Sequence, residues 1–235
     1  YADSLPTLAG LLLGCQRKWV NSSRRLAEAL AGRRAAEGRA RPLPGDTLVL
    51  GVPRGGVVVA AEVARILGYD LDIEVVRKIG APGNPEYAVA AVDADGELIA
   101  GENLTADEEY LRREAVSAGA EIRRRLAVYR ADRPVPVIAG RTVVLVDDGV
   151  ATGLTLIAAV RSLRRRGAVR IIVAAPVASP SAEQALYREA DETVVLWVDP
   201  RLRAVGQYYT RFGQVTDAEV IAALRASWHE RGQAR

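Results

Sequence analysis

Two adjacent acids followed by a short loop with two threonines form the most chemically informative cluster in the sequence. Asp147 and Asp148 directly follow an apolar run at 143–146, and a stretch of small residues leads from them into a helical pattern. A loop between a buried strand and a helix can bind an anion, because free backbone N–H groups and the positive end of the helix dipole meet there. The hydroxyl groups of Thr152 and Thr155 would add two donors.

The two carboxylates limit which anion could bind. They would repel a phosphate placed beside them, so they are better suited to face hydroxyl groups or a divalent cation. A ligand with a phosphate at one end and a vicinal diol in the middle would satisfy both halves of the cluster, and ribose 5-phosphate has that shape. The loop is not a Walker loop, because it has no Lys and no G-K-[ST] run.

The elements that must position this cluster alternate between strand and helix. Apolar runs and helical periodicity, with capping boxes at 105–108 and 216–219, predict strands at 47–51, 71–76, 142–146, 169–177 and 193–198, and helices at 22–34, 57–67, 105–130, 156–166, 181–190 and 216–228. This alternation predicts an α/β fold: an open, mainly parallel twisted sheet with helices on both faces. Ligands of such sheets bind at the carboxyl ends of the strands.

A second motif, Pro53-Arg54-Gly55-Gly56, follows the first predicted strand. The forked guanidinium of Arg54 beside free backbone amides would suit a pyrophosphate. An ordinary tight turn with a surface arginine would have the same sequence, so this motif alone leaves both interpretations open.

A third motif begins with Arg77-Lys78 at the end of the strand predicted at 71–76. Residues 79–87 are rich in Gly and Pro, and we expect them to have no regular structure. A mobile loop next to two cations is one interpretation, and a surface loop flanked by solvated charges is the other. Residues 90–100 alternate around 93–96 and predict a hairpin.

Taken together, the three motifs resemble those of type I phosphoribosyltransferases. The matching segments read G-V-P-R-G-G, then V-V-R-K-I-G-A-P-G-N-P-E-Y, then V-V-L-V-D-D-G-V-A-T-G-L-T, and the whole is similar to a bacterial group whose substrates are undefined. The resemblance runs from about residue 22 to the C-terminal helix. It implies Mg²⁺-dependent transfer of the 5-phosphoribosyl group from phosphoribosyl pyrophosphate (PRPP) to a nucleobase-like acceptor, with release of pyrophosphate.

The resemblance also implies roles for individual residues. The 5-phosphate would be bound by Ala151, Thr152, Gly153, Leu154 and Thr155, and the pyrophosphate by Pro53, Arg54, Gly55, Gly56, Arg77 and Lys78. The catalytic residues would be Asp147, Asp148, Arg77 and Lys78, and the closing lid would include Gly80, Pro82, Asn84, Glu86 and Tyr87. Mg²⁺ would enter mainly with PRPP, with Asp147 and Asp148 as candidate ligands. In this family the turn at Pro53–Gly56 commonly holds a non-proline cis peptide.

Aromatic residues gather near the C-terminus of a chain that is only 5% aromatic. Tyr208, Tyr209 and Phe212 are therefore candidates for a small hood that stacks on a flat acceptor. The competing interpretation, which we favour for any single residue, is that they pack the C-terminal segment onto the core.

Composition excludes several other classes of protein. His229 is the only histidine, which removes Ser–His–Asp triads and His-ligated zinc. Cys15 is the only cysteine, so no intrachain disulfide can form and a cytoplasmic location is favoured. A net charge of +3 does not indicate nucleic-acid binding.

We expect one domain at 21–235, preceded by a segment of uncertain role at 1–20 whose apolar run is too short to span a membrane. The domain would contain a lid loop and hairpin at 79–100, a long helix at 105–130, and the hood with the C-terminal helix at 199–235. The resemblance implies a homodimer. Two alternatives stay open: a regulator that senses PRPP or a nucleotide without turnover, and a ribosyl-phosphate hydrolase or phosphorylase.

Overall fold

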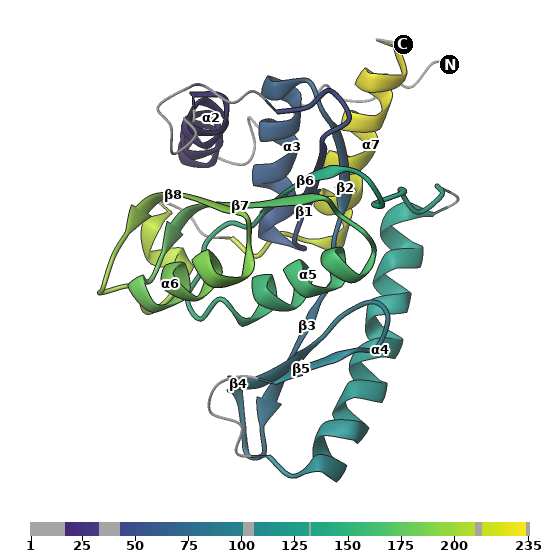
Figure 1. Ribbon diagram of the computed structural model, residues 1–235, viewed down its shortest axis with the longest axis vertical. Helices are drawn as coiled ribbons and strands as arrows, with labels where there is room; N and C mark the ends of the chain where they lie inside the picture. The colour runs from purple at the N-terminus through teal and green to yellow at the C-terminus, as the bar shows by residue number, and fades with distance from the viewer. Residues whose placement is uncertain (1–16, 33–42, 101–105, 132, 210–212, 234–235) are drawn as a thin grey trace.

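The computed structural model describes residues 17–32, 43–100, 106–131, 133–209 and 213–233 (Figure 1). Its main body is a five-stranded sheet in the order β2-β1-β6-β7-β8, in which every neighbouring pair is parallel. The strands are β1 (Leu48–Gly51), β2 (Asp70–Ile73), β6 (Thr142–Val146), β7 (Arg170–Ala178) and β8 (Glu192–Val198).

The central strand β6 is buried on both faces, as its run of β-branched and apolar residues predicts. Successive side chains of a strand point to opposite faces. Val144 and Val146 therefore enter one apolar core, whereas Val143 and Leu145 enter the other.

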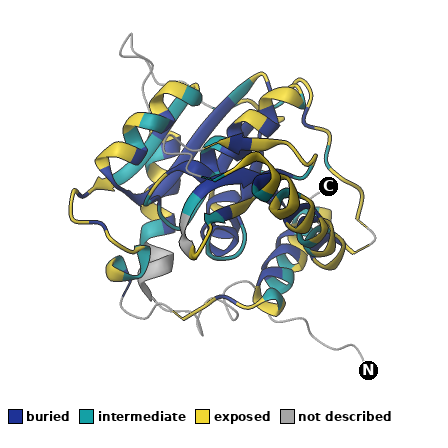
Figure 2. Ribbon diagram, turned by 90° about the horizontal axis from the view of Figure 1, so that it is seen from below, coloured by how far each residue is buried: buried dark blue, intermediate teal, exposed yellow. Residues whose placement is uncertain are grey.

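Helices cover both faces of the sheet, which confirms the predicted fold class (Figure 1). On one side lie α2 (Arg17–Gly32), α3 (Gly55–Leu67) and α7 (Asp217–Gln233), and on the other lie α5 (Leu154–Arg165) and α6 (Pro180–Glu189). Seen from below, buried strands occupy the middle of the molecule, and the flanking helices show exposed outer faces (Figure 2). In the described residues we find no helix that combines the length and hydrophobicity needed to cross a bilayer.

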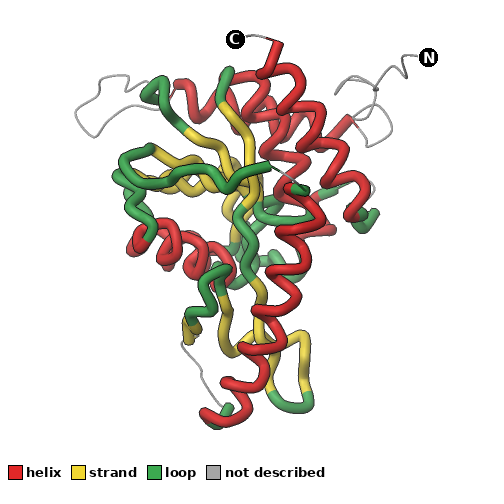
Figure 3. Tube along the Cα trace, turned by 90° about the vertical axis from the view of Figure 1, so that its right-hand side faces the viewer, coloured by secondary structure: helices red, strands yellow, loops and turns green. Residues whose placement is uncertain are grey.

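A smaller antiparallel sheet projects from the main body along a long helix (Figures 1 and 3). It consists of β3 (Arg77–Ala81), β4 (Asn84–Val92) and β5 (Leu98–Ala100), and it packs on α4 (Glu108–Arg130). We call this sheet together with the N-terminal half of α4 the arm. The hairpin predicted at 90–100 is confirmed, since Asp93 accepts hydrogen bonds from the backbone of Asp95 and Glu97 at its turn.

The expectation that 79–87 lacks regular structure is wrong. These residues form the hairpin of β3 and β4, with Pro82 and Gly83 in a tight turn. Gly80 lies where the pairing register shifts, so it accommodates an irregularity within the strand. Pro82 and Gly83 therefore mark a turn, and Gly80 marks an irregularity within a strand, so this Gly- and Pro-rich stretch is not a loop.

Several predicted boundaries also move. Strand β2 ends at Ile73 rather than at residue 76, because Gly51 is the last residue of β1 with which it pairs. Helix α2 begins at Arg17, several residues before the predicted cap, and α7 continues to Gln233 instead of ending near residue 228.

Helix capping follows the predicted residues at one helix and differs at another. The N-cap of α4 is Asp107, which accepts a hydrogen bond from the Tyr110 backbone N–H at 2.7 Å, whereas the predicted cap at 105 lies outside the described residues. At α7 the predicted box is confirmed by reciprocal hydrogen bonds between Thr216 and Glu219.

Candidate functional site

Parallel pairing of β1 with β6 brings two distant motifs together. Gly51 lies opposite Val146, so the turn after β1 and the acid pair after β6 meet at the carboxyl edge of the sheet. A Cβ on Gly55 would overlap the Asp148 carboxylate, and one on Gly56 would lie 2.8 Å from the Val146 carbonyl oxygen. The two glycines are thus required by close approach to the acids. In the same turn, the peptide between Pro53 and Arg54 is cis.

The two acids crowd each other at the edge of the sheet. Burial, followed by repulsion from Asp148, raises the pKa of Asp147 well above its usual range, and burial likewise raises the pKa of Asp148. The charge of Lys78 partly offsets both increases in pKa. Within the described ranges, no Arg or Lys nitrogen comes within the 4.0 Å of an ion pair with either carboxylate. This arrangement leaves the carboxyl oxygens without a described cationic partner, so a ligand hydroxyl group or cation can meet them.

The loop after the acids has free donors. Gly153, at a φ of +79°, ends the loop, and α5 begins at Leu154. In the part of the chain that is described, none of the backbone N–H groups from Ala151 to Thr155 donates to a protein acceptor. These groups sit at the start of a twelve-residue helix, so they can bind an anion as the sequence predicts.

The predicted cations separate in the structure. Arg77 and Lys78 are neighbours on β3, and consecutive side chains of a strand point in opposite directions. The guanidinium of Arg77 lies 3.9 Å from the Glu121 carboxylate on α4, whereas the charge of Lys78 acts on the acid pair. Arg54 immediately precedes the glycines that contact the acids and occupies the N-cap position of α3. The structure therefore directs the charge of Lys78 at the acids, whereas Arg77 faces Glu121 and the charge of Arg54 acts on Tyr129 of α4.

The predicted lid residues lie on the β3–β4 hairpin. Gly80 is in β3, Pro82 is in the turn, and β4 carries the others: Asn84, Glu86 and Tyr87. The carbonyl oxygen of Gly80 accepts a hydrogen bond from the Tyr110 hydroxyl at 2.9 Å, which fastens the hairpin to α4. Ala91 and Ile99 of the arm pack against Leu154 and Ala158 of α5, so the arm contacts the helix that begins at the anion loop.

The predicted hood lies partly on the site. The buried Tyr209 donates its hydroxyl hydrogen to the Asp148 backbone carbonyl at 2.6 Å, and Val205 packs so close to Gly149 that a Cβ there would lie 2.6 Å away. Tyr208 is half-buried and packs against the apolar core, whereas Phe212 lies outside the described residues. The C-terminal segment is thus packed onto the core and also held against the acid loop.

Sequence reasoning missed Ser179. Its hydroxyl caps α6 through the Ala182 backbone N–H at 3.1 Å and donates to the Ala151 carbonyl at 2.7 Å. A serine between a strand and a proline is a typical signal for a helix N-cap, and Pro180 follows it here. The sequence could therefore have indicated the cap, but not the contact with the anion loop.

The donor set suits a hard cation that is only partly held by protein. Asp147 and Asp148 offer carboxylate oxygens, the ligands that Mg²⁺ prefers, beside a loop suited to phosphate. Across the described segments, no cluster of three or more His, Cys, Asp or Glu residues could hold a metal ion. Protein ligands that number one or two and are completed by substrate phosphates are the usual arrangement for Mg²⁺.

Comparisons with known proteins agree with this geometry. The family described as the phosphoribosyl transferase domain matches residues 24–199. Two curated Mycobacterium tuberculosis proteins, MT0597 of strain CDC 1551 and Rv0571c of strain H37Rv, are 38% identical over 202 residues; their names assign them provisionally as phosphoribosyl transferases. The match covers 83% of this chain and 45% of each relative, so the chain spans about half the length of the curated relatives.

One solved structure is similar to this chain over most of the length of both proteins. The crystal structure of TT1426 from Thermus thermophilus is 48% identical in sequence and superposes with a TM-score of 0.72. The match covers 88% of this chain and 95% of that one.

Proposed function

Because the chain belongs to the phosphoribosyl transferase domain family, we propose that it transfers the 5-phosphoribosyl group from PRPP to a nucleobase-like acceptor and releases pyrophosphate. One observation carries this proposal. A loop with free backbone donors at 151–155 lies directly beside two carboxylates that have no ionic partner among the described residues. A phosphorylated sugar is the ligand that uses both features.

The anion loop binds the 5-phosphate in this proposal. The backbone N–H groups of Ala151 to Thr155 donate to the phosphate oxygens, and the dipole of α5 favours the negative charge. The hydroxyl groups of Thr152 and Thr155 supply two further donors. These contacts fix one end of the sugar and thereby its distance from the acid pair.

The acid pair binds the sugar itself. Asp147 and Asp148 accept hydrogen bonds from the ribose hydroxyls, and their negative charge stabilises the cationic character that develops on the ribose as pyrophosphate leaves. When Mg²⁺ is bound, these residues would hold it, and the ion would supply charge neutralisation on the pyrophosphate oxygens.

The turn after β1 and the start of β3 bind the pyrophosphate. The guanidinium of Arg54 and the ammonium of Lys78 neutralise its oxygens. The glycines of the turn Pro53–Gly56 let its backbone lie directly against the acids. Arg77 would contribute only after leaving Glu121, from which it now lies 3.9 Å away. The β3–β4 hairpin would exclude water when it closes over the site, with the hood at Tyr208 and Tyr209 next to the acceptor.

We also propose a homodimer in the cytoplasm. The dimer follows from the resemblance of the three motifs, and the location from a sequence with Cys15 as its only cysteine. The oligomeric state is measured by sedimentation of the purified chain with and without PRPP.

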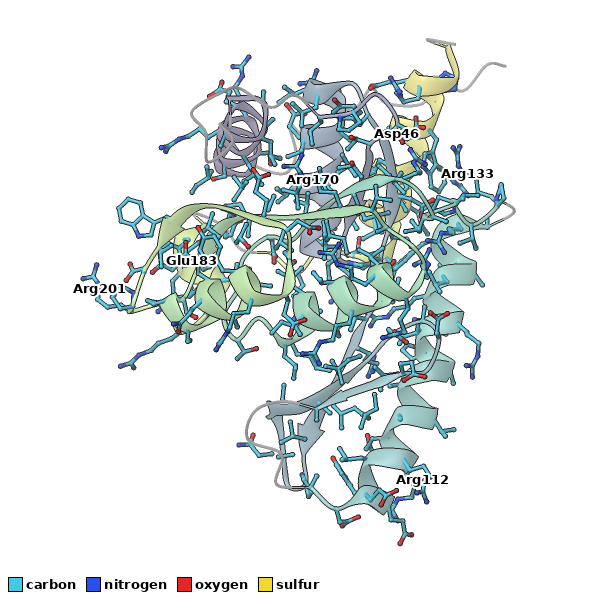
Figure 4. The ribbon with its side chains drawn as sticks, in the orientation of Figure 1. Asp46, Arg112, Arg133, Arg170, Glu183 and Arg201 are labelled. Carbon is cyan, nitrogen blue, oxygen red and sulfur yellow. The ribbon has the colours of Figure 1, made fainter. Side chains whose placement is uncertain are left out.

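The proposal is tested by replacing the acid pair. The variant with Asp147→Asn and Asp148→Asn should release pyrophosphate from PRPP at least about a thousandfold more slowly, because both stabilising charges are lost. Asp46→Asn is a matched control: this exposed acid lies at the amino end of the sheet, away from the site (Figure 4). Pyrophosphate release is measured with Mg²⁺ and a panel of purine and pyrimidine bases.

The same assay separates the alternatives. Calorimetric binding of PRPP without pyrophosphate release for any base would identify a sensor. Formation of ribose 5-phosphate without any base would identify a hydrolase. Wild-type turnover in the double variant would refute the assigned role of the acids.

A further inference from the structure

Three backbone carbonyl groups between Asp148 and Ala151 accept hydrogen bonds from other segments of the protein. The Asp148 carbonyl accepts the Tyr209 hydroxyl at 2.6 Å, the Val150 carbonyl accepts the Ser179 backbone N–H at 2.9 Å, and the Ala151 carbonyl accepts the Ser179 hydroxyl at 2.7 Å. Three carbonyls within four consecutive residues are thus bonded to segments that follow β7 and β8. The N–H groups from Ala151 to Thr155, by contrast, have no acceptor among the described residues.

This asymmetry fixes the direction of the N–H groups. In a trans peptide the C=O and N–H bonds point in opposite directions across a plane that rotates as one unit. A hydrogen bond that holds the Ala151 carbonyl therefore aims the Thr152 N–H away from Ser179. In the same way, the bond to the Asp148 carbonyl orients the peptide that joins this acid to Gly149.

We propose that the hydroxyl groups of Tyr209 and Ser179 are positioning groups for the two ends of the bound sugar phosphate. Ser179 aims the Thr152 N–H at the 5-phosphate, and Tyr209 fixes the peptide after Asp148 and thereby holds this acid beside the ribose. The inference rests on the proposed function, since these positions matter only if a sugar phosphate binds there. Neither side chain needs to touch the substrate. Each acts through a backbone carbonyl of the loop.

Both hydroxyl groups are themselves held in place, as a positioning group requires. Tyr209 is 8% exposed and packs in the apolar core, and the neighbouring Val205 presses on Gly149. Ser179 is 9% exposed, and its oxygen is oriented by the Ala182 N–H that it caps. The loop is therefore hydrogen-bonded to two well-packed side chains, Tyr209 and Ser179, which lie on separate segments.

The test compares the two halves of the substrate site. Tyr209→Phe and Ser179→Ala each remove one hydroxyl, and binding of ribose 5-phosphate and of magnesium pyrophosphate is measured by calorimetry. We expect each variant to bind ribose 5-phosphate roughly five- to tenfold more weakly, the usual effect of one lost hydrogen bond. Binding of pyrophosphate, which depends on Arg54 and Lys78, should be unchanged.

Two further variants serve as controls. Ser179→Thr keeps a hydroxyl group and should restore ribose 5-phosphate binding. Tyr69→Phe removes the same kind of bond, a tyrosine hydroxyl that donates to the Leu43 carbonyl at 3.0 Å, at the far end of α3. It should bind both ligands as the wild type does.

Different results would overturn the two proposals. Wild-type affinity for ribose 5-phosphate in both hydroxyl-deleted variants, or equal losses for both ligands, would refute the positioning role. If the wild type binds no ribose 5-phosphate, the proposed function fails. Independently of ligand binding, crystal structures of the unliganded variants test the hydrogen bonds themselves: peptides after Asp148 and Ala151 that keep their wild-type orientation would refute the positioning role.

Discussion

Two sets of carboxylates lie near the ends of strands in this protein, and they differ in what faces them. The buried Asp72 on β2 accepts a hydrogen bond from the Arg130 guanidinium at 2.8 Å, and that guanidinium also donates to the Ile73 carbonyl. Asp147 and Asp148 after β6 lie against a turn whose two glycines allow this close approach, and no described cation pairs with them. One set is neutralised by another element of the fold, and the other remains available.

Two more acids follow the first pattern. Asp93 at the β4–β5 turn pairs with Arg165, and Glu74 after β2 accepts hydrogen bonds from Arg166 at 2.8 Å and from Ser162 at 3.0 Å. All three of these partners lie in the last turn of α5 or at its C-cap, so the paired acids fasten that helix to the arm and to the edge of the main sheet. Burial nevertheless raises the pKa of Glu74, since it outweighs the attraction of Arg166.

Under the proposed function, the difference separates structural acids from functional ones. A paired buried acid specifies a tertiary contact, because leaving either partner alone is costly. An acid pair with raised pKa values that no described cation neutralises is, by contrast, a candidate functional site. Other arginines pair with neither set of acids. Arg112 and Arg201, for example, lie at the periphery of the molecule (Figure 4).

The largest effect is expected where a buried pair is broken. Arg130→Gln leaves the Asp72 carboxylate buried without its charge partner, so the free energy of unfolding should fall by about 3–5 kcal/mol. Urea denaturation measures it. Arg161→Gln is the matched control, since it removes a more exposed pair with Glu189 and should cost under about 1 kcal/mol. Equal losses in both variants would erase the distinction between the two sets.

A methyl group at the contact between the Gly55 backbone and Asp148 should reduce activity more than stability. Gly55→Ala places a Cβ on the Asp148 carboxylate and must displace it, so kcat/KM for PRPP should fall at least about a hundredfold. Gly45→Ala, where a Cβ would meet nothing within 4 Å, should have wild-type kinetics. A fully active Gly55→Ala enzyme would show that the position of Asp148 is not critical.

The smallest effect concerns the free energy of folding that is lost when the acid pair is ionised. Since the pKa of Asp147 is raised in the folded protein, its ionised form opposes folding at neutral pH. Asp147→Asn should therefore raise the melting temperature of the unliganded protein by a few degrees at pH 7. The gain should shrink as the pH falls and vanish below the unfolded pKa of about 3.9, where both states carry the proton. A melting temperature that falls at pH 7 would contradict the proposed cost.

Much of the fold could be predicted because its signals are local. The apolar run of β6, the glycine that follows α5 and the capping box at Thr216 each act within a few residues. The same local reasoning failed at 79–87. Glycine and proline indicate that the chain turns, but they do not show that a two-residue turn joins two paired strands.

Some parts of the candidate site could likewise be predicted from the sequence, and others could not. The acids, the anion loop and the Pro53–Gly56 turn could be named from residue types. Which of Arg77 and Lys78 faces the acids could not, because strand alternation makes the answer depend on where β3 lies relative to β6 and α4. Ser179 could not be linked to the loop for a similar reason: the contact forms through the pairing of β6 with β7.

Propensity, periodicity and short-range hydrogen bonds were enough to predict the strands of the main sheet, the helices, their order and the residue types suited to a sugar phosphate. Which acids are neutralised by a cation, and which are not, depends on contacts between distant segments. Asp72 meets Arg130 across 58 positions, and Gly51 lies opposite Val146 through strand pairing. Contacts at such separations arise only when the sheet assembles, since no local pattern specifies which strands become neighbours.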